Sequence, residues 1–88
     1  PVAALDGVEA HLRDASAWVQ RGDDDGAFLA ASRALALAPD QPGIVADVAR
    51  LLARMGRWDD GRRLCRSFLL QRPDSDPVQR ALVELGPG

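Results

Sequence analysis

The sequence resembles itself after a shift of 34 residues, and this period constrains the fold more than any other feature. Two residues that end helices keep the phase, because Gly22 falls on Gly56 and Pro39 falls on Pro73. Further identities at this shift are Ala15 with Ala49, Asp25 with Asp59, Leu35 with Leu69 and Asp40 with Asp74. A period of about twenty to fifty residues is typical of a solenoid, in which each unit buries its apolar face on the next.

Apolar spacing and helix-ending residues predict four helices and a shorter fifth, and no strand pattern competes with them. The first helix is expected to run from about 7 to 21, with Asp6 as its cap and Glu9 in a position close to a capping box. Gly22 and Pro39 are expected to end the first and second helices. The later helices are expected at about 40–56, 58–71 and 76–85.

The connections between these helices are only a few residues long, so neighbouring helices must be antiparallel. The sequence therefore predicts an all-α solenoid of antiparallel helix pairs within a single domain of residues 1–88. Repeat one is expected at about 8–41, repeat two at about 42–75, and a C-terminal capping helix at about 76–85. A hydrophobic fraction of 47% with 27% charged residues is that of a globular chain rather than a disordered one.

Period, helix pairs and small residues together resemble the tetratricopeptide repeat, whose pattern is W-x2-L-G-x2-Y, then A-x3-F, then P. The matching positions are His11, Asp14, Ala15, Trp18, Ala27, Ala31 and Pro39 in the first unit, and Val45, Val48, Ala49, Leu52, Gly61, Cys65 and Pro73 in the second. His11 and Asp14 depart from the large residues of the pattern, so the start of the first unit is degenerate. In the family, small residues lie where two helices approach closely.

This resemblance implies an interaction scaffold whose first helices line a concave groove for a peptide or a partner helix, and not an enzyme. By the same resemblance, the groove positions are Leu12, Ser16, Gln20, Ala46, Arg50 and Arg54. One subset of the family holds a C-terminal carboxylate in a clamp of Lys, Asn and Arg. The Lys and Asn of that clamp are missing here, which argues against binding of that kind.

Arg50 and Arg54, one helical turn apart, are the strongest candidate binding residues, and Arg80 is expected to face the same groove from the last helix. A guanidinium forms paired hydrogen bonds with a carboxylate, so these arginines predict an acidic peptide or carboxylate as the ligand. The alternative is a solvated helix face on which Asp47 pairs with Arg50 three residues away.

A second basic group is expected on an outer, solvated face of the fourth helix; its members are Arg57, Arg62, Arg63 and Arg66. No catalytic set, metal site or cofactor is predicted. His11 is the only histidine, and the only cysteine, Cys65, is expected in a helix face as a small apolar residue. The acids Asp23 to Asp25 lack the alternating spacing of a calcium loop and predict a helix start instead.

The net charge of -2 argues against nucleic acid or an anionic membrane as the partner. Residues 1–44 carry a net charge of -4 and residues 45–88 carry +2. This asymmetry leaves self-association into a structural unit as one alternative to peptide binding. A regulatory or targeting segment of a larger bacterial enzyme is another. With one cysteine, nothing points to an oxidising compartment, and a cytoplasmic location is expected.

Overall fold

The computed structural model describes the backbone of residues 2–86 and the side chains of residues 7–86. Within this range the chain forms five helices and no strand. These are α1 (Val2–Gln20), α2 (Asp24–Leu37), α3 (Pro42–Arg54), α4 (Trp58–Gln71) and α5 (Asp76–Leu85). The all-α class and the helix pairs predicted from the sequence are confirmed.

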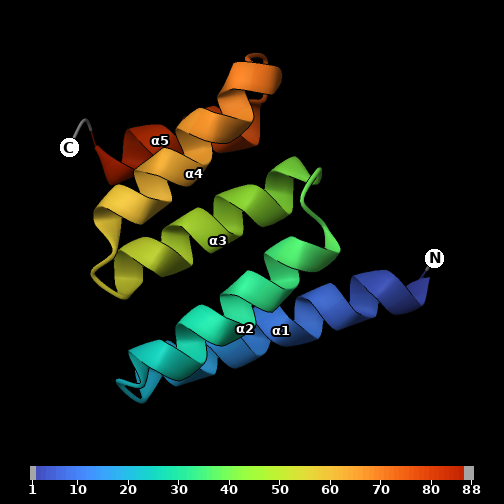
Figure 1. Cartoon of the computed structure of the whole chain (residues 1–88), viewed down its shortest axis with the longest axis vertical. Coiled ribbons are helices and arrows are strands. Elements are labelled where there is room, and N and C mark those ends of the chain that lie inside the picture. Colours follow the sequence, from blue (N-terminus) through green and yellow to red (C-terminus); the bar gives the residue numbers. More distant parts are fainter. Residues whose placement is uncertain (1, 87–88) are drawn as a thin grey trace.

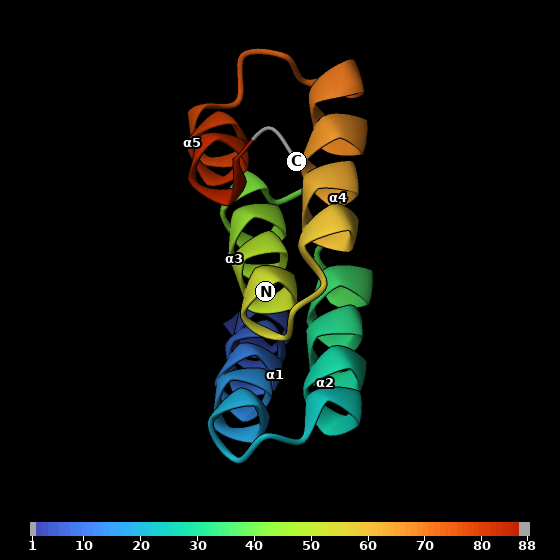
Figure 2. The same cartoon turned by 90° about the vertical axis from the view of Figure 1, so that its left-hand side faces the viewer.

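The helices form two layers. Figure 1 shows α1 and α2 as one antiparallel pair and α3 and α4 as a second pair, with α5 lying behind α4. In the perpendicular view, α1, α3 and α5 occupy one layer and α2 and α4 occupy the other (Figure 2). The three first helices of successive units therefore lie side by side, which is the arrangement that a stack of helix pairs produces.

Local signals explain where most of these helices begin and end. The Asp23 carboxylate accepts a hydrogen bond of 2.9 Å from the Gly26 amide and caps the start of α2. Gly22 and Gly56 follow α1 and α3 with φ of 81° and 84°, the left-handed conformation that glycine adopts without strain. The chain turns sharply at both points, so each pair closes as a tight hairpin.

The expected start of the first helix was wrong. α1 begins at Val2, and Asp6 lies inside the helix rather than at its cap. Residues 3–5 are Ala, Ala and Leu, which have high helix propensity, so nothing in this segment stops the helix before Asp6. An acid followed three residues later by Glu9 resembled a capping box but has no such role here.

Alanine-rich clusters join the units. One core cluster lies between the two helix pairs; its buried members are Ala15, Ala27, Ala30, Ala31, Val48, Leu51, Leu52 and Met55. A second cluster fixes α5 against the second pair; its buried members are Val45, Ala46, Ala49, Ala53, Cys65, Val78, Ala81 and Leu85. Because small side chains fill these interfaces, the helices approach closely, as the family resemblance implies.

Candidate functional site

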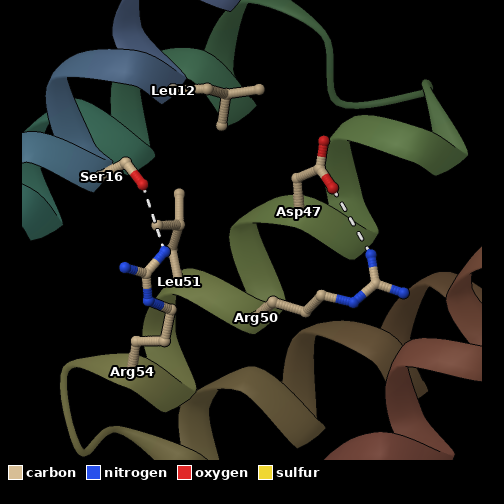
Figure 3. Close-up of a pocket in the computed structure, with 6 residues that line it drawn as sticks. All are labelled: Leu12, Ser16, Asp47, Arg50, Leu51 and Arg54. Atoms are coloured by element: carbon tan, nitrogen blue, oxygen red, sulfur yellow. Dashed lines mark hydrogen bonds and ion pairs between the residues drawn. The ribbon is translucent and has the colours of Figure 1, made fainter.

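Among the described residues no polar or charged residue is buried, so candidate sites must lie at the surface. One hollow of about 290 Å³ lies between α1 and α3. Its lining residues are Leu12, Ser16, Asp47, Arg50, Leu51 and Arg54, and we call it the α1–α3 hollow. Figure 3 shows Leu12 and Ser16 projecting from α1 toward the side chains of α3. Four of the seven residues predicted for the groove therefore come together here.

The other three predicted residues lie elsewhere. Gln20 is exposed in the last turn of α1 and does not line the α1–α3 hollow. Arg80 lines a separate hollow on α5 together with Asp76, Gln79, Val83 and Glu84. Ala46, a groove position by resemblance, is only 1% exposed because it is packed in the core cluster that holds α5.

Arg54 is joined to the first repeat through a hydroxyl group. Its Nη1 donates a hydrogen bond of 3.2 Å to Ser16 Oγ, across from α3 to α1. Among residues 7–86, no carboxylate lies within ion-pair distance of this guanidinium. A neutral hydroxyl accepts a weaker hydrogen bond than a carboxylate does, so Arg54 has unused capacity to bind an anion.

Arg50 extends the opposite way and is already paired. Its Nε donates a hydrogen bond of 2.6 Å to Glu84 Oε2 on α5, and its Nη1 lies 3.5 Å from Asp47 Oδ1. The Glu84 carboxylate raises the pKa of the Arg50 guanidinium above its usual value. The predicted alternative, an Asp47–Arg50 pair within α3, is present, and Glu84 is a stronger second acceptor that the sequence reasoning did not include.

A signal for Glu84 was nonetheless in the sequence. Ser16, Arg50 and Glu84 are separated by one repeat length each, so they occupy the same position on three successive first helices. The helices α1, α3 and α5, which carry these residues, lie next to one another in one layer (Figure 2). In a stack of repeats, residues at the same repeat position follow one another across such a layer. A carboxylate at the third of these positions is therefore placed beside the arginine at the second.

The floor of the hollow is apolar. Leu51 is only 6% exposed and belongs to the core cluster between the repeats, while Leu12 is partly buried against the same cluster. An apolar floor beside a hydroxyl-bonded guanidinium can hold an aliphatic side chain and a neighbouring carboxylate together.

Comparison with protein families agrees with the fold. A family model described as tetratricopeptide repeat matches residues 19–85. The chain belongs to the tetratricopeptide repeat family. Proteins with tetratricopeptide repeats generally mediate protein–protein interactions, and the repeat is typically a non-catalytic module. A comparison with curated proteins and one with solved structures gave no match.

The tetratricopeptide match begins after the degenerate positions of the first unit. His11 and Asp14 precede residue 19, whereas every matching position of the second unit lies inside the matched range. The small positions of the repeat behave as the family pattern implies, since Ala15, Ala27 and Ala49 are fully buried. Leu12 and Ser16 also precede the match, so two of the six residues that line the α1–α3 hollow lie outside it.

Other residues singled out in this tetratricopeptide chain have structural surroundings. Cys65 is buried against α5, and burial raises the pKa of its thiol, so it behaves as a core residue. Trp58 is 47% exposed at the start of α4. Among the described residues, no group of three or more His, Cys, Asp or Glu side chains could hold a metal ion. No described helix has the length and apolarity that crossing a bilayer requires.

The second basic group is not uniformly solvated, which corrects the expectation for Arg62. Its side chain is 11% exposed, whereas that of the adjacent Arg63 is 76% exposed. Arg62 Nη1 donates a hydrogen bond of 3.0 Å to the carbonyl oxygen of Leu85 at the end of α5, and Nη2 lies 2.7 Å from Asp59 Oδ1. A cation at the C-terminal end of a helix satisfies a free carbonyl and interacts favourably with the helix dipole.

We expect Arg62→Ala to lower the free energy of unfolding by about 1–3 kcal/mol, because it leaves a part-buried carbonyl without its donor. The matched control, Arg63→Ala, should change it by less than about 0.5 kcal/mol, since that side chain is exposed. Urea unfolding followed by circular dichroism measures both. Equal effects of the two substitutions would show that Arg62 does not anchor α5.

Proposed function

We propose that this protein binds an acidic peptide segment of a partner protein in the α1–α3 hollow. The observation that carries the proposal is the state of Arg54, whose guanidinium faces the hollow and donates to a hydroxyl group, with no carboxylate beside it among residues 7–86. A peptide carboxylate at this point would form a charge-assisted hydrogen bond in place of a neutral one.

The rest of the hollow supports a peptide ligand rather than a small anion. Leu12 and Leu51 supply an apolar surface for a side chain next to the carboxylate. The hollow is open to solvent on the layer formed by α1, α3 and α5 (Figure 2), so it suits an extended segment or one face of a helix. Arg50 lies one turn from Arg54 and could bind a second acidic group of the same segment.

Nuclear magnetic resonance tests this proposal directly. The probe is a short acetylated and amidated peptide in which glutamates alternate with leucines, and its control replaces each glutamate by glutamine. We expect the acidic peptide to shift the amide signals of Leu12, Ser16 and Leu51 and the Nε–H signal of Arg54. The glutamine peptide should bind less tightly because it lacks the charge.

The result that would overturn the proposal is an absence of shifts at the hollow, or shifts confined to α2 and α4 in the other layer. Light scattering on the same samples across a concentration series tests the alternative of self-association. A molecular mass that rises with protein concentration, and falls when salt is added, would favour a self-assembling unit instead.

A further inference from the structure

The two arginines of the α1–α3 hollow are in different states, although one turn of α3 separates them. Arg54 meets a hydroxyl group on α1, whereas Arg50 meets a carboxylate on α5 at 2.6 Å. Figure 3 shows the two side chains diverging, with Arg54 directed toward Ser16 and Arg50 directed toward the red ribbon of α5. A ligand carboxylate can therefore reach Arg54 directly but must compete with Glu84 for Arg50.

The Arg50–Glu84 pair is accessible enough to exchange. The Arg50 side chain is 39% exposed and the Glu84 side chain is 57% exposed, so water and ions reach both partners. Exposed ion pairs are weak because each partner is well solvated when they separate. An incoming carboxylate that replaces Glu84 gives Arg50 an equivalent acceptor, while Glu84 returns to solvent.

The docking of α5 does not depend on this pair. Val78 and Ala81 are fully buried and Leu85 is 6% exposed in the cluster that joins α5 to α3 and α4. Arg62 adds a hydrogen bond to the last turn of the same helix. Loss of the Glu84 carboxylate therefore leaves the apolar contacts of α5 intact, and Glu84 can be tested without removing the helix.

We infer that Glu84 is a specificity-determining residue that occupies Arg50 in the free protein as an internal competitor of the acidic ligand. The inference rests on the proposed function, since it concerns how the same hollow selects its peptide. With Glu84 in place, a ligand with one carboxylate binds through Arg54 alone. A ligand with two carboxylates gains the second contact only by displacing Glu84 from Arg50.

The test compares Glu84→Gln with a control of equal net charge, Asp14→Asn. Asp14 is exposed on α1 and does not line the hollow, so its substitution reports the general effect of removing one negative charge. The same glutamate–leucine peptide is titrated into wild type and both variants at about 0.1 M salt, where the screening length is about 10 Å. We expect Glu84→Gln to bind it about two- to fivefold more tightly than wild type, the range for loss of one exposed pair.

Two further readouts separate competition from a purely structural role. The Nε–H signal of Arg50 should move in Glu84→Gln without peptide, and in wild type it should move only as peptide is added. The glutamine peptide should bind wild type and Glu84→Gln equally, because it does not compete for Arg50. Thermal unfolding confirms that Glu84→Gln retains the helices.

Each outcome decides the inference. Tighter binding by Glu84→Gln than by wild type and Asp14→Asn supports it, including the case in which only Glu84→Gln binds measurably. If Glu84→Gln binds the peptide no more tightly than wild type or than Asp14→Asn, and wild type still binds at the hollow, the inference is overturned and the proposed function stands. Absence of binding by every variant overturns both.

Discussion

Replacing Gly61 by valine is expected to lower the free energy of unfolding by more than about 3 kcal/mol and to separate α5 from the second helix pair. A Cβ at Gly61 would lie 2.8 Å from the carbonyl oxygen of Ala49 and 2.8 Å from Leu85 Cδ2. The first contact is with the backbone of α3, which cannot yield unless α3 and α4 move apart. The second is with a side chain of the cluster that holds α5.

A loss of this size is a large fraction of the total free energy of unfolding, which is about 5–15 kcal/mol for a single domain. The melting temperature should fall by more than about 10 °C, measured by circular dichroism at 222 nm. Gly61→Ala should also destabilise the protein, although alanine has a higher helix propensity than glycine. In that variant, the close contacts outweigh the gain in propensity.

Gly43→Ala is the matched control, since Gly43 is also helical but a Cβ there would meet nothing within 4 Å. Because no steric penalty opposes the higher helix propensity of alanine, the free energy of unfolding of this variant should rise by about 0.5–1 kcal/mol. Opposite signs for the two alanine substitutions would establish that α3 and α4 touch at Gly61. A stabilising Gly61→Ala would contradict this packing.

The sequence was sufficient to predict the elements of this fold, because the signals that end helices are local. Pro39, Pro73 and the two glycines after α1 and α3 act on their own backbone, so their effect needs no knowledge of tertiary structure. The start of α1 was predicted wrongly because residues 2–5 contain no local signal that marks the beginning of a helix. The repeat period supplied the pairing that local signals cannot give.

Spacing placed the candidate residues within each helix, and the family resemblance brought those of α1 and α3 together, but neither gave the contacts that α5 makes. Arg50 and Arg54 share a face of α3 because they are four residues apart, and this spacing is visible in the sequence. The contact between Arg50 and Glu84 depends on how closely α5 approaches α3, which is set by the buried side chains of α5. The burial of Arg62 could not be predicted from its sequence neighbours either, because it depends on the position of the last turn of α5.

The double substitution Arg50→Glu with Arg54→Glu is expected to weaken capture of the glutamate–leucine peptide by at least about tenfold. Each reversal removes an attraction and adds a repulsion toward a peptide carboxylate, so the effect of each site is roughly doubled. Arg54 should contribute more than Arg50 in single variants, because Glu84 already occupies Arg50 in the free protein. Fluorescence anisotropy of a labelled peptide measures the affinities.

The double variant also changes the net charge, so its control must change the net charge equally. Arg33→Glu with Arg63→Glu does so at two exposed positions on α2 and α4, in the layer away from the hollow. Long-range repulsion should weaken peptide binding by a similar factor in both double variants, and added salt should remove that component. A loss confined to Arg50→Glu with Arg54→Glu, and persisting at higher salt, would place recognition at the hollow. Equal losses that salt abolishes would mean that the peptide responds only to the overall charge of the protein.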